Sequence, residues 1–273
     1  MSVAFYPNQR LSVAGTELNI VQSANVDFSV KRQEVFEFGS SFAVDFVQTD
    51  AATVNMNFEY ALATGASYTI DHNLNAIGLN DLSAIISDTV GKTYILTGAG
   101  TLTVPSGVVQ SYSFNAAVGS VPTVSIGIMA QNATYSAAAS ATPKTSATSA
   151  SAFTPQTILL KHGGTEYVTK SAKLNLDIPR QMVYKLGSLT PIAIITNGAA
   201  KVTIDAELIL GSTSTIDEIP GDITIEVGTA GSFTAKKLKR NKFSTKYGTN
   251  DVVMASVTWE GIITEATDLE LLG

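Results

Sequence analysis

The chain has 273 residues, 45% hydrophobic and 15% charged, which is too apolar for disorder and enough to bury the core of one or two domains. Its 17 basic and 23 acidic residues give a net charge of −6, which excludes tight wrapping of a phosphate backbone. The absence of cysteine excludes disulfides, thiolate metal sites and a cysteine nucleophile. Because no apolar run approaches about 20 residues and no secretory signal is visible, we expect no membrane partner and assembly in the cytoplasm.

The first half of the chain alternates repeatedly between apolar and polar residues, as in residues 24–30 and 54–60. In the second segment the apolar set is Val54, Met56, Phe58 and Tyr60, and the polar set is Asn55, Asn57 and Glu59. This period of two predicts antiparallel strands with one buried face and one wet face. The best helix candidate is short, with Asn80 as N-cap before Leu82, Ile85 and Ile86 at helical spacing.

Residues 131–156 differ in composition from the rest of the chain. They are rich in Ala, Ser and Thr, carry one charge (Lys144) and show neither the strand nor the helix period. This composition predicts a linker or an extended arm. We expect it to be ordered in an assembly, where it must connect two domains.

An internal repeat divides the chain into two copies. A shift of 148 residues aligns Ser23–Leu62 with Ser171–Leu210 without a gap, and 12 of the 40 positions are identical. Near the end of each copy, Phe114, Gly119 and Val124 are matched with Phe243, Gly248 and Val253. The predicted domains are 1–130 (copy one) and 157–273 (copy two), joined by the linker 131–156.

The two copies differ in charge. Copy one has 4 basic and 10 acidic residues, whereas copy two has 12 basic and 13 acidic residues. Two copies of one fold in a chain would let three chains imitate a six-fold ring, although a double-domain adaptor would also be duplicated.

The segment VQSANVDFSVKRQEVFEFGSSFAV (residues 21–44) resembles the opening motif of bacteriophage tail tube proteins (major tail proteins). Copy two repeats it as TKSAKLNLDIPRQMVYKLGSLTPI (169–192), and VNMNFEY and VGSVPTVSIGI also fit that family. The resemblance covers both halves apart from the linker and the insert 64–110. It implies a mainly β fold of two tandem, homologous rolled β-sandwich or barrel domains with a short helix, whose inner sheets join into a large ring barrel.

The resemblance further implies a structural virion protein of the viral tail, with no enzymatic activity and no cofactor. Stacked rings, trimeric and pseudo-hexameric, would form a hollow conduit for genome ejection. Its partners would be the protein itself and, as candidates, tail sheath, tape measure, baseplate and terminator proteins, with DNA only in transit. The runner-up is a tandem β-sandwich adhesion or binding module on a virion surface, and an enzyme is a distant third.

The wet faces of the predicted strands supply candidate lumen residues, because an acidic to neutral lining would neutralise few phosphates. The candidates are Asp27, Asn55, Asn57, Glu59, Asp177, Thr203, Asp205 and Glu207. Alternation alone leaves open whether this face lines the lumen or a solvated outer surface.

Candidate intersubunit contacts are basic. Arg32 and Arg180 recur at equivalent positions beside a glycine turn and predict an ion pair within or between subunits. The basic run comprises Lys236, Lys237, Lys239, Arg240, Lys242 and Lys246. We interpret this run as a contact for the acidic copy one of a neighbour rather than as a nucleic-acid patch.

Other motifs carry no chemistry. Gly91-Lys92-Thr93 resembles the end of a phosphate-binding loop, but Ile86 stands where that loop needs glycine. His72 and His162 have no partner at metal or triad spacing and are predicted at the surface, and Trp259 is predicted in the core. The sequence therefore predicts no catalytic and no metal site.

Overall fold

Strands dominate the chain, which confirms the predicted mainly β fold. The computed structural model describes residues 9–38, 42–48, 52–64, 72–79, 82–87, 91–98, 100–137, 151–152, 155–163, 165–186, 188, 191–210, 221–227, 231–247 and 253–271.

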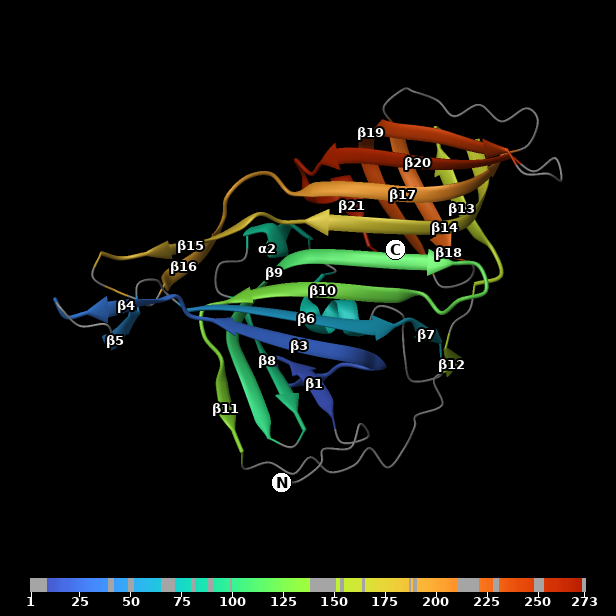
Figure 1. Cartoon of the computed structure of the whole chain (residues 1–273). Coiled ribbons are helices and arrows are strands. Elements are labelled where there is room, and N and C mark those ends of the chain that lie inside the picture. The colour runs from blue at the N-terminus through green and yellow to red at the C-terminus, as the bar shows by residue number, and fades with distance from the viewer. Residues whose placement is uncertain are drawn as a thin grey trace.

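One wide antiparallel sheet crosses the whole molecule (Figure 1). Eight of its strands lie side by side in the order β3 (Val21–Ser29), β6 (Thr53–Ala61), β10 (Thr123–Ala130), β9 (Thr101–Ala117), β14 (Thr165–Asp177), β17 (Lys201–Leu210), β20 (Val253–Ile262) and β19 (Ser232–Tyr247). The first four strands come from the first half of the chain and the last four from the second half. The halves meet edge to edge, where β9 pairs with β14.

The second half repeats the strand order and the register of the first half. In β3, Val21 lies opposite Tyr60 and a bulge precedes Ser23. In β14, Thr169 lies opposite Leu208 and the same bulge precedes Ser171. The shift of 148 residues therefore holds for backbone pairing as well as for sequence.

The predicted match at the end of each copy is wrong by two residues. Tyr112 lies opposite Ile126 in β10, and its counterpart opposite Val257 in β20 is Phe243. The shift for these strands is therefore 131 residues, whereas the sequence match of Phe114 with Phe243 implies 129. A slip of two residues leaves every side chain on the same face, so alternation cannot detect it.

Each copy rolls into two layers because its longest strand bends. The first part of β9 pairs with β8 (Lys92–Thr97) and the second part with β10; β19 divides likewise between β18 (Gly221–Val227) and β20. At the bends, Ser106 and Lys237 have positive φ values of 53° and 60°. These residues are 131 positions apart, so the bend itself is repeated.

The remaining elements complete these rolls. They are β1 (Arg10–Val13), β2 (Thr16–Glu17), β7 (Ala63–Thr64), β11 (Thr134–Ser136), β12 (Ser151–Ala152), β13 (Ile158–His162), β21 (Leu269–Glu270), the 3-10 helix Ala266–Asp268, and the helices α1 (His72–Ile77) and α2 (Leu82–Ser87). Helix α2 confirms the predicted helix, whose N-cap Asn80 lies outside the described residues. Helix α1 was not predicted.

The core lies between the layers and contains the predicted apolar positions. Val54, Met56, Phe58 and Tyr60 are buried, as are their counterparts in β17 and Trp259 in β20. His162, in contrast, is buried, with its ring centroid 6.0 Å from that of Trp259, so its predicted surface position is wrong. The side chain of His72 lies outside the described part of the chain.

Both ends of the linker contain short paired strands. β11 pairs with β9, and β12 pairs with β7. Residues 138–150 of the linker lie outside the described residues. Where it is described, the linker therefore runs along copy one rather than as a free arm.

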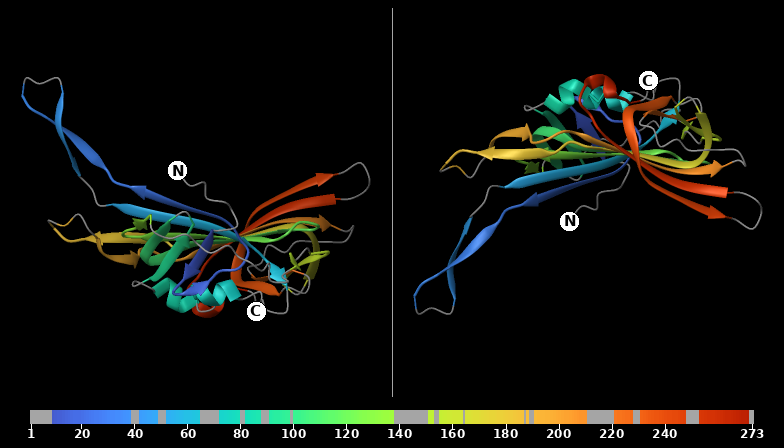
Figure 2. Two further views of the ribbon diagram at one scale, coloured as in Figure 1. Left: turned by 90° about the horizontal axis from the view of Figure 1, so that it is seen from below. Right: turned by 90° about the horizontal axis from the view of Figure 1, so that it is seen from above.

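Two hairpins project from the same end of the wide sheet (Figure 2). The first joins β4 (Arg32–Phe36) to β5 (Ala43–Gln48), and the second joins β15 (Arg180–Tyr184) to β16 (Pro191–Thr196). Their registers, bulges included, are related by the shift of 148 residues. The first hairpin stands away from the body of the molecule, whereas the second lies close to it.

Candidate assembly surfaces

The candidate lumen residues share one face of the wide sheet. Asn55, Asn57 and Glu59 alternate with the buried positions of β6, and Thr203, Asp205 and Glu207 alternate with those of β17. Asp27 and Asp177 are exposed at equivalent ends of the neighbouring region. The predicted division into a wet face and a core face is therefore present.

This wet face is hollowed and polar across copy two. A cavity of about 390 Å³ spans β9, β14, β17, β20 and β19, and Lys173, Asp205 and Lys242 contribute to its lining. Thr258 donates a hydrogen bond to Asp205 at 2.6 Å, and the Lys170 Nζ lies 3.3 Å from a Glu207 carboxylate oxygen. The acids of copy two are thus partly compensated by basic neighbours and hydroxyl donors.

The in-chain junction, where β9 pairs with β14, is dry on its core face. Leu174 lies opposite Phe114, and Leu176 lies opposite Tyr112. The exposed fractions of these four side chains are 1% or less. Burial of four large apolar side chains along one ladder makes this junction part of the core.

The two outer edges of the sheet are open counterparts of this junction. Within the described residues, β3 pairs with β6 alone, and residues 242–247 of β19 pair with β20 alone. Phe28 in β3 is 56% exposed and Phe243 in β19 is 43% exposed. Their counterparts by the 148 and 131 shifts are Leu176 and Tyr112, which are buried against each other. Sequence reasoning missed both phenylalanines, although the repeat could have identified them.

Arg180 fastens the second hairpin to copy one. Its Nε donates to the Val109 carbonyl at 3.0 Å, and its terminal nitrogens donate to the carbonyls of Ile85 and Ile86 in α2. Beyond it on β15, Met182 packs with Val108 and Ile194. Arg32, the counterpart of Arg180, is exposed on the projecting hairpin.

The predicted basic cluster does not form one patch. Lys237 makes a 2.9 Å ion pair with Asp268, which is itself buried. This ammonium, together with hydrogen bonds from Thr264, holds the pKa of Asp268 well below its ordinary value of 3.8. The Arg240 guanidinium lies 5.2 Å from the centroid of the Phe243 ring, within cation–π range. The cluster therefore divides between a structural ion pair and the open edge.

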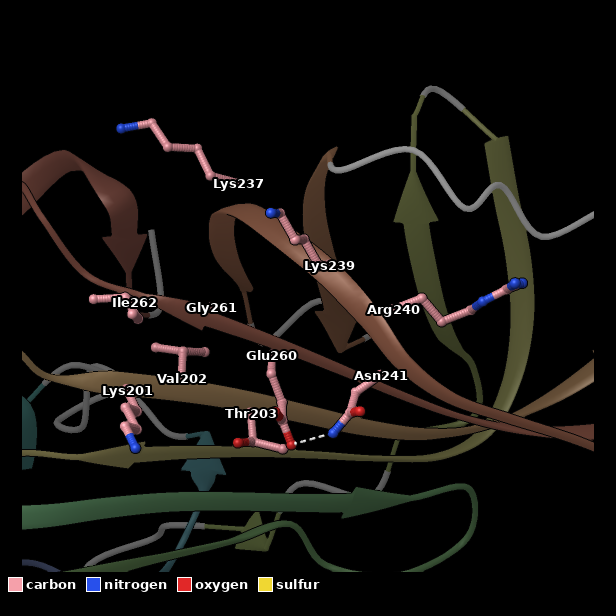
Figure 3. A pocket seen from close by; sticks show the side chains of 10 residues that line it. All are labelled: Lys201, Val202, Thr203, Lys237, Lys239, Arg240, Asn241, Glu260, Gly261 and Ile262. Atoms are coloured by element: carbon pink, nitrogen blue, oxygen red, sulfur yellow. Dashed lines mark hydrogen bonds between the residues drawn. The ribbon is translucent and has the colours of Figure 1, made fainter.

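A second cavity, of about 700 Å³, lies beside this cluster (Figure 3). Its lining carries four basic residues and one acid, namely Lys201, Lys237, Lys239, Arg240 and Glu260. Asn241 donates to Glu260 at 2.7 Å across its floor. The cavity is thus basic and open to a partner of opposite charge.

The remaining motifs fit the structural interpretation. Lys92 begins strand β8 and donates to the Ala76 carbonyl at 3.1 Å, so Gly91-Lys92-Thr93 does not begin a helix that could hold phosphate. Among the described residues, no cluster of three or more His, Cys, Asp or Glu side chains has metal-binding geometry. The described helices include none that is long and apolar enough to cross a membrane.

A rolled β fold with open sheet edges and a continuous polar face is typical of proteins that assemble with copies of themselves. Residues 79–261 match the family model described as phage tail tube protein, a span of more than half of the chain. The chain therefore belongs to the phage tail tube protein family, which gives it a structural role in the virion tail and assembly into a tube with itself and other tail components. A search of curated proteins finds no match.

Proposed function

We propose that three chains form each ring of the tail tube, so that six tube domains surround a lumen through which the genome is ejected. In this proposal residues 1–130 and 157–273 are the two tube domains, and residues 131–156 connect them. The observation that carries it is the repeated sheet, with one junction made inside the chain and both outer edges open.

The edges can close only between chains. β3 and the 242–247 part of β19 lie at opposite sides of the wide sheet, so they cannot pair within one molecule (Figure 1). An open strand edge exposes unpaired backbone groups, and closure into a barrel removes that hazard. Pairing of unlike edges is a head-to-tail contact, which forms a ring when the rotation closes.

The in-chain junction supplies the register of this contact. Leu176 lies opposite Tyr112 in the in-chain ladder. Applying the two repeat shifts sets Phe28 of one chain opposite Phe243 of the next, and Asp27 opposite Ser244. Lys242 and Lys246 flank Ser244 on the same face of β19, so Asp27 would gain two cationic neighbours.

The wet face lines the lumen in this arrangement. Closing the wide sheet into a ring requires each rolled core to lie on one side of it, and the hollowed polar face lies on the other. On this face copy one contributes only the acids Asp27 and Glu59, whereas copy two carries both signs of charge. Such a lining would release few counterions from DNA and let it slide.

Microscopy and native mass spectrometry of the full chain test the proposal. We expect negative-stain images of stacked rings, and rings that contain three chains. Six chains per ring would contradict the proposed stoichiometry. Dispersed particles at high protein concentration would favour the adhesion module instead.

A further inference from the structure

The cavity of Figure 3 occupies the place in copy two that the second hairpin occupies on copy one. In copy one, the site is formed by Val108, Val109 and Gln110 of β9. The 131 shift converts these residues into Lys239, Arg240 and Asn241, which line the cavity. The cavity is therefore the counterpart of a filled docking site.

The projecting hairpin is the counterpart of the element that fills that site. Its strands β4 and β5 have the same register and the same bulge as β15 and β16. Within the described residues its side chains from Arg32 to Phe38 are exposed, including Val35, Phe36 and Phe38. One hairpin is thus docked and its repeat stands free (Figure 2).

We propose that the β4–β5 hairpin of one chain docks in this cavity of a second copy, and that an ion pair between Glu34 and Lys239 holds it there. This inference rests on the proposed ring. It assigns to the cavity an occupant from the same protein.

The backbone contacts of the docked hairpin give the first part of the geometry. The Ile178 N–H donates to the Gln110 carbonyl at 2.8 Å, and Arg180 donates to the Val109 carbonyl. The repeat shifts convert these bonds into Val30 to the Asn241 carbonyl and Arg32 to the Arg240 carbonyl. Both involve main-chain acceptors, so the change of side chains on β19 leaves them intact.

The side-chain contact changes its chemistry between the two sites. In copy one, Met182 packs against Val108 in an apolar cluster. The equivalent residues are Glu34 on the free hairpin and Lys239 in the cavity, so an apolar pair is replaced at both positions by opposite charges. A single replacement would leave a charge against an apolar surface, whereas the double replacement retains complementarity.

The cavity is suited to an acidic guest. It is lined by four basic residues and by Glu260, whose carboxylate already accepts from Asn241. The exposed acids Glu34, Glu37 and Asp45 lie on the hairpin with Lys31 and Arg32. Because the in-chain site is apolar and the interchain site is charged, each hairpin has a different preferred site, which fixes the order of copies around the ring.

Charge exchange in the full-length protein tests this docking, with the assembled fraction measured by sedimentation and negative-stain microscopy. Glu34→Lys and Lys239→Glu should each reduce the association constant at least about tenfold, and the double exchange should restore it to within about threefold. Both positions are exposed, so the thermal unfolding of the unassembled chain should be unchanged. Glu37→Lys is the matched control on the same hairpin, because its counterpart Lys185 stays exposed in the docked hairpin.

A second variant keeps the test decisive if a charge exchange impairs folding. Glu34→Met combined with Lys239→Val copies the in-chain pair, and its assembly should lose salt sensitivity between about 0.1 M and 1 M NaCl. Single exchanges that assemble like wild type, or a double exchange no better than either single one, would overturn the docking. If the wild-type protein itself forms no rings, the proposed function fails instead.

Discussion

The in-chain junction and the open edges are the same structural element in two states. At the junction, Leu176 and Tyr112 have exposed fractions of 1% and 0%. At the edges, Phe28 and Phe243 occupy the repeated positions and have exposed fractions of 56% and 43%. The large apolar side chains at the edges are explained by a partner strand that the single chain lacks. A duplicated protein thus displays, within one molecule, a template for the contact between molecules.

The largest expected effect is at the in-chain junction. Leu176→Asp would bury an unpaired carboxylate between β9 and β14, so we expect a loss of about 3–5 kcal/mol in the free energy of unfolding. Denaturant unfolding of the unassembled chain measures this loss. A variant as stable as wild type would show that the junction is not part of the core.

The same substitution at the repeated edge position should leave the fold intact. We expect Phe28→Asp to change the free energy of unfolding by less than about 1 kcal/mol, because the side chain is exposed in the single chain. Ring formation should be lost, since the carboxylate would face Phe243 of the next chain without a partner. Size-exclusion chromatography distinguishes the outcomes, and normal tubes from this variant would contradict the pairing of β3 with β19.

The ion pair of Lys237 with Asp268 gives a pH-dependent effect at the bend of β19. A folded-state pKa below the ordinary 3.8 means that the stabilisation is present above that value and is lost as pH falls through the folded-state pKa. Asp268→Asn should therefore be less stable than wild type at pH 7, and the difference should shrink below pH 3.8. Thermal melts from pH 2 to pH 7 measure it, and a pH-independent difference would exclude the carboxylate as its source.

The smallest effect on assembly is expected on the wet face. Glu59→Lys with Glu207→Lys should leave tubes intact, because both side chains are at least partly exposed. If the face lines the lumen, three chains would present six new cations to DNA and slow its ejection. Phe58→Asp, on the opposite face of β6, should instead prevent folding through a buried charge. Assembly of the Phe58 variant together with failure of the lysine variant would reverse the two faces.

Alternation and repetition in the sequence determined much of this protein. The period of two in β6 predicts its buried and wet faces, since successive side chains of a strand point to opposite sides. The repeat predicts equivalent roles for residues 148 positions apart, down to the bulges. The motif at residues 21–44 led to the family that residues 79–261 match.

Tertiary structure decided the features that depend on which strand lies beside which. Local pattern treats Leu176 and Phe28 alike, and only the pairing of β14 with β9 makes one of them core and the other edge. The correct 131-residue match required hydrogen-bond register, because a slip of two residues preserves alternation. The burial of His162 beside Trp259, the docking of Arg180 and the basic cavity likewise arise from contacts between distant segments, which no local period encodes.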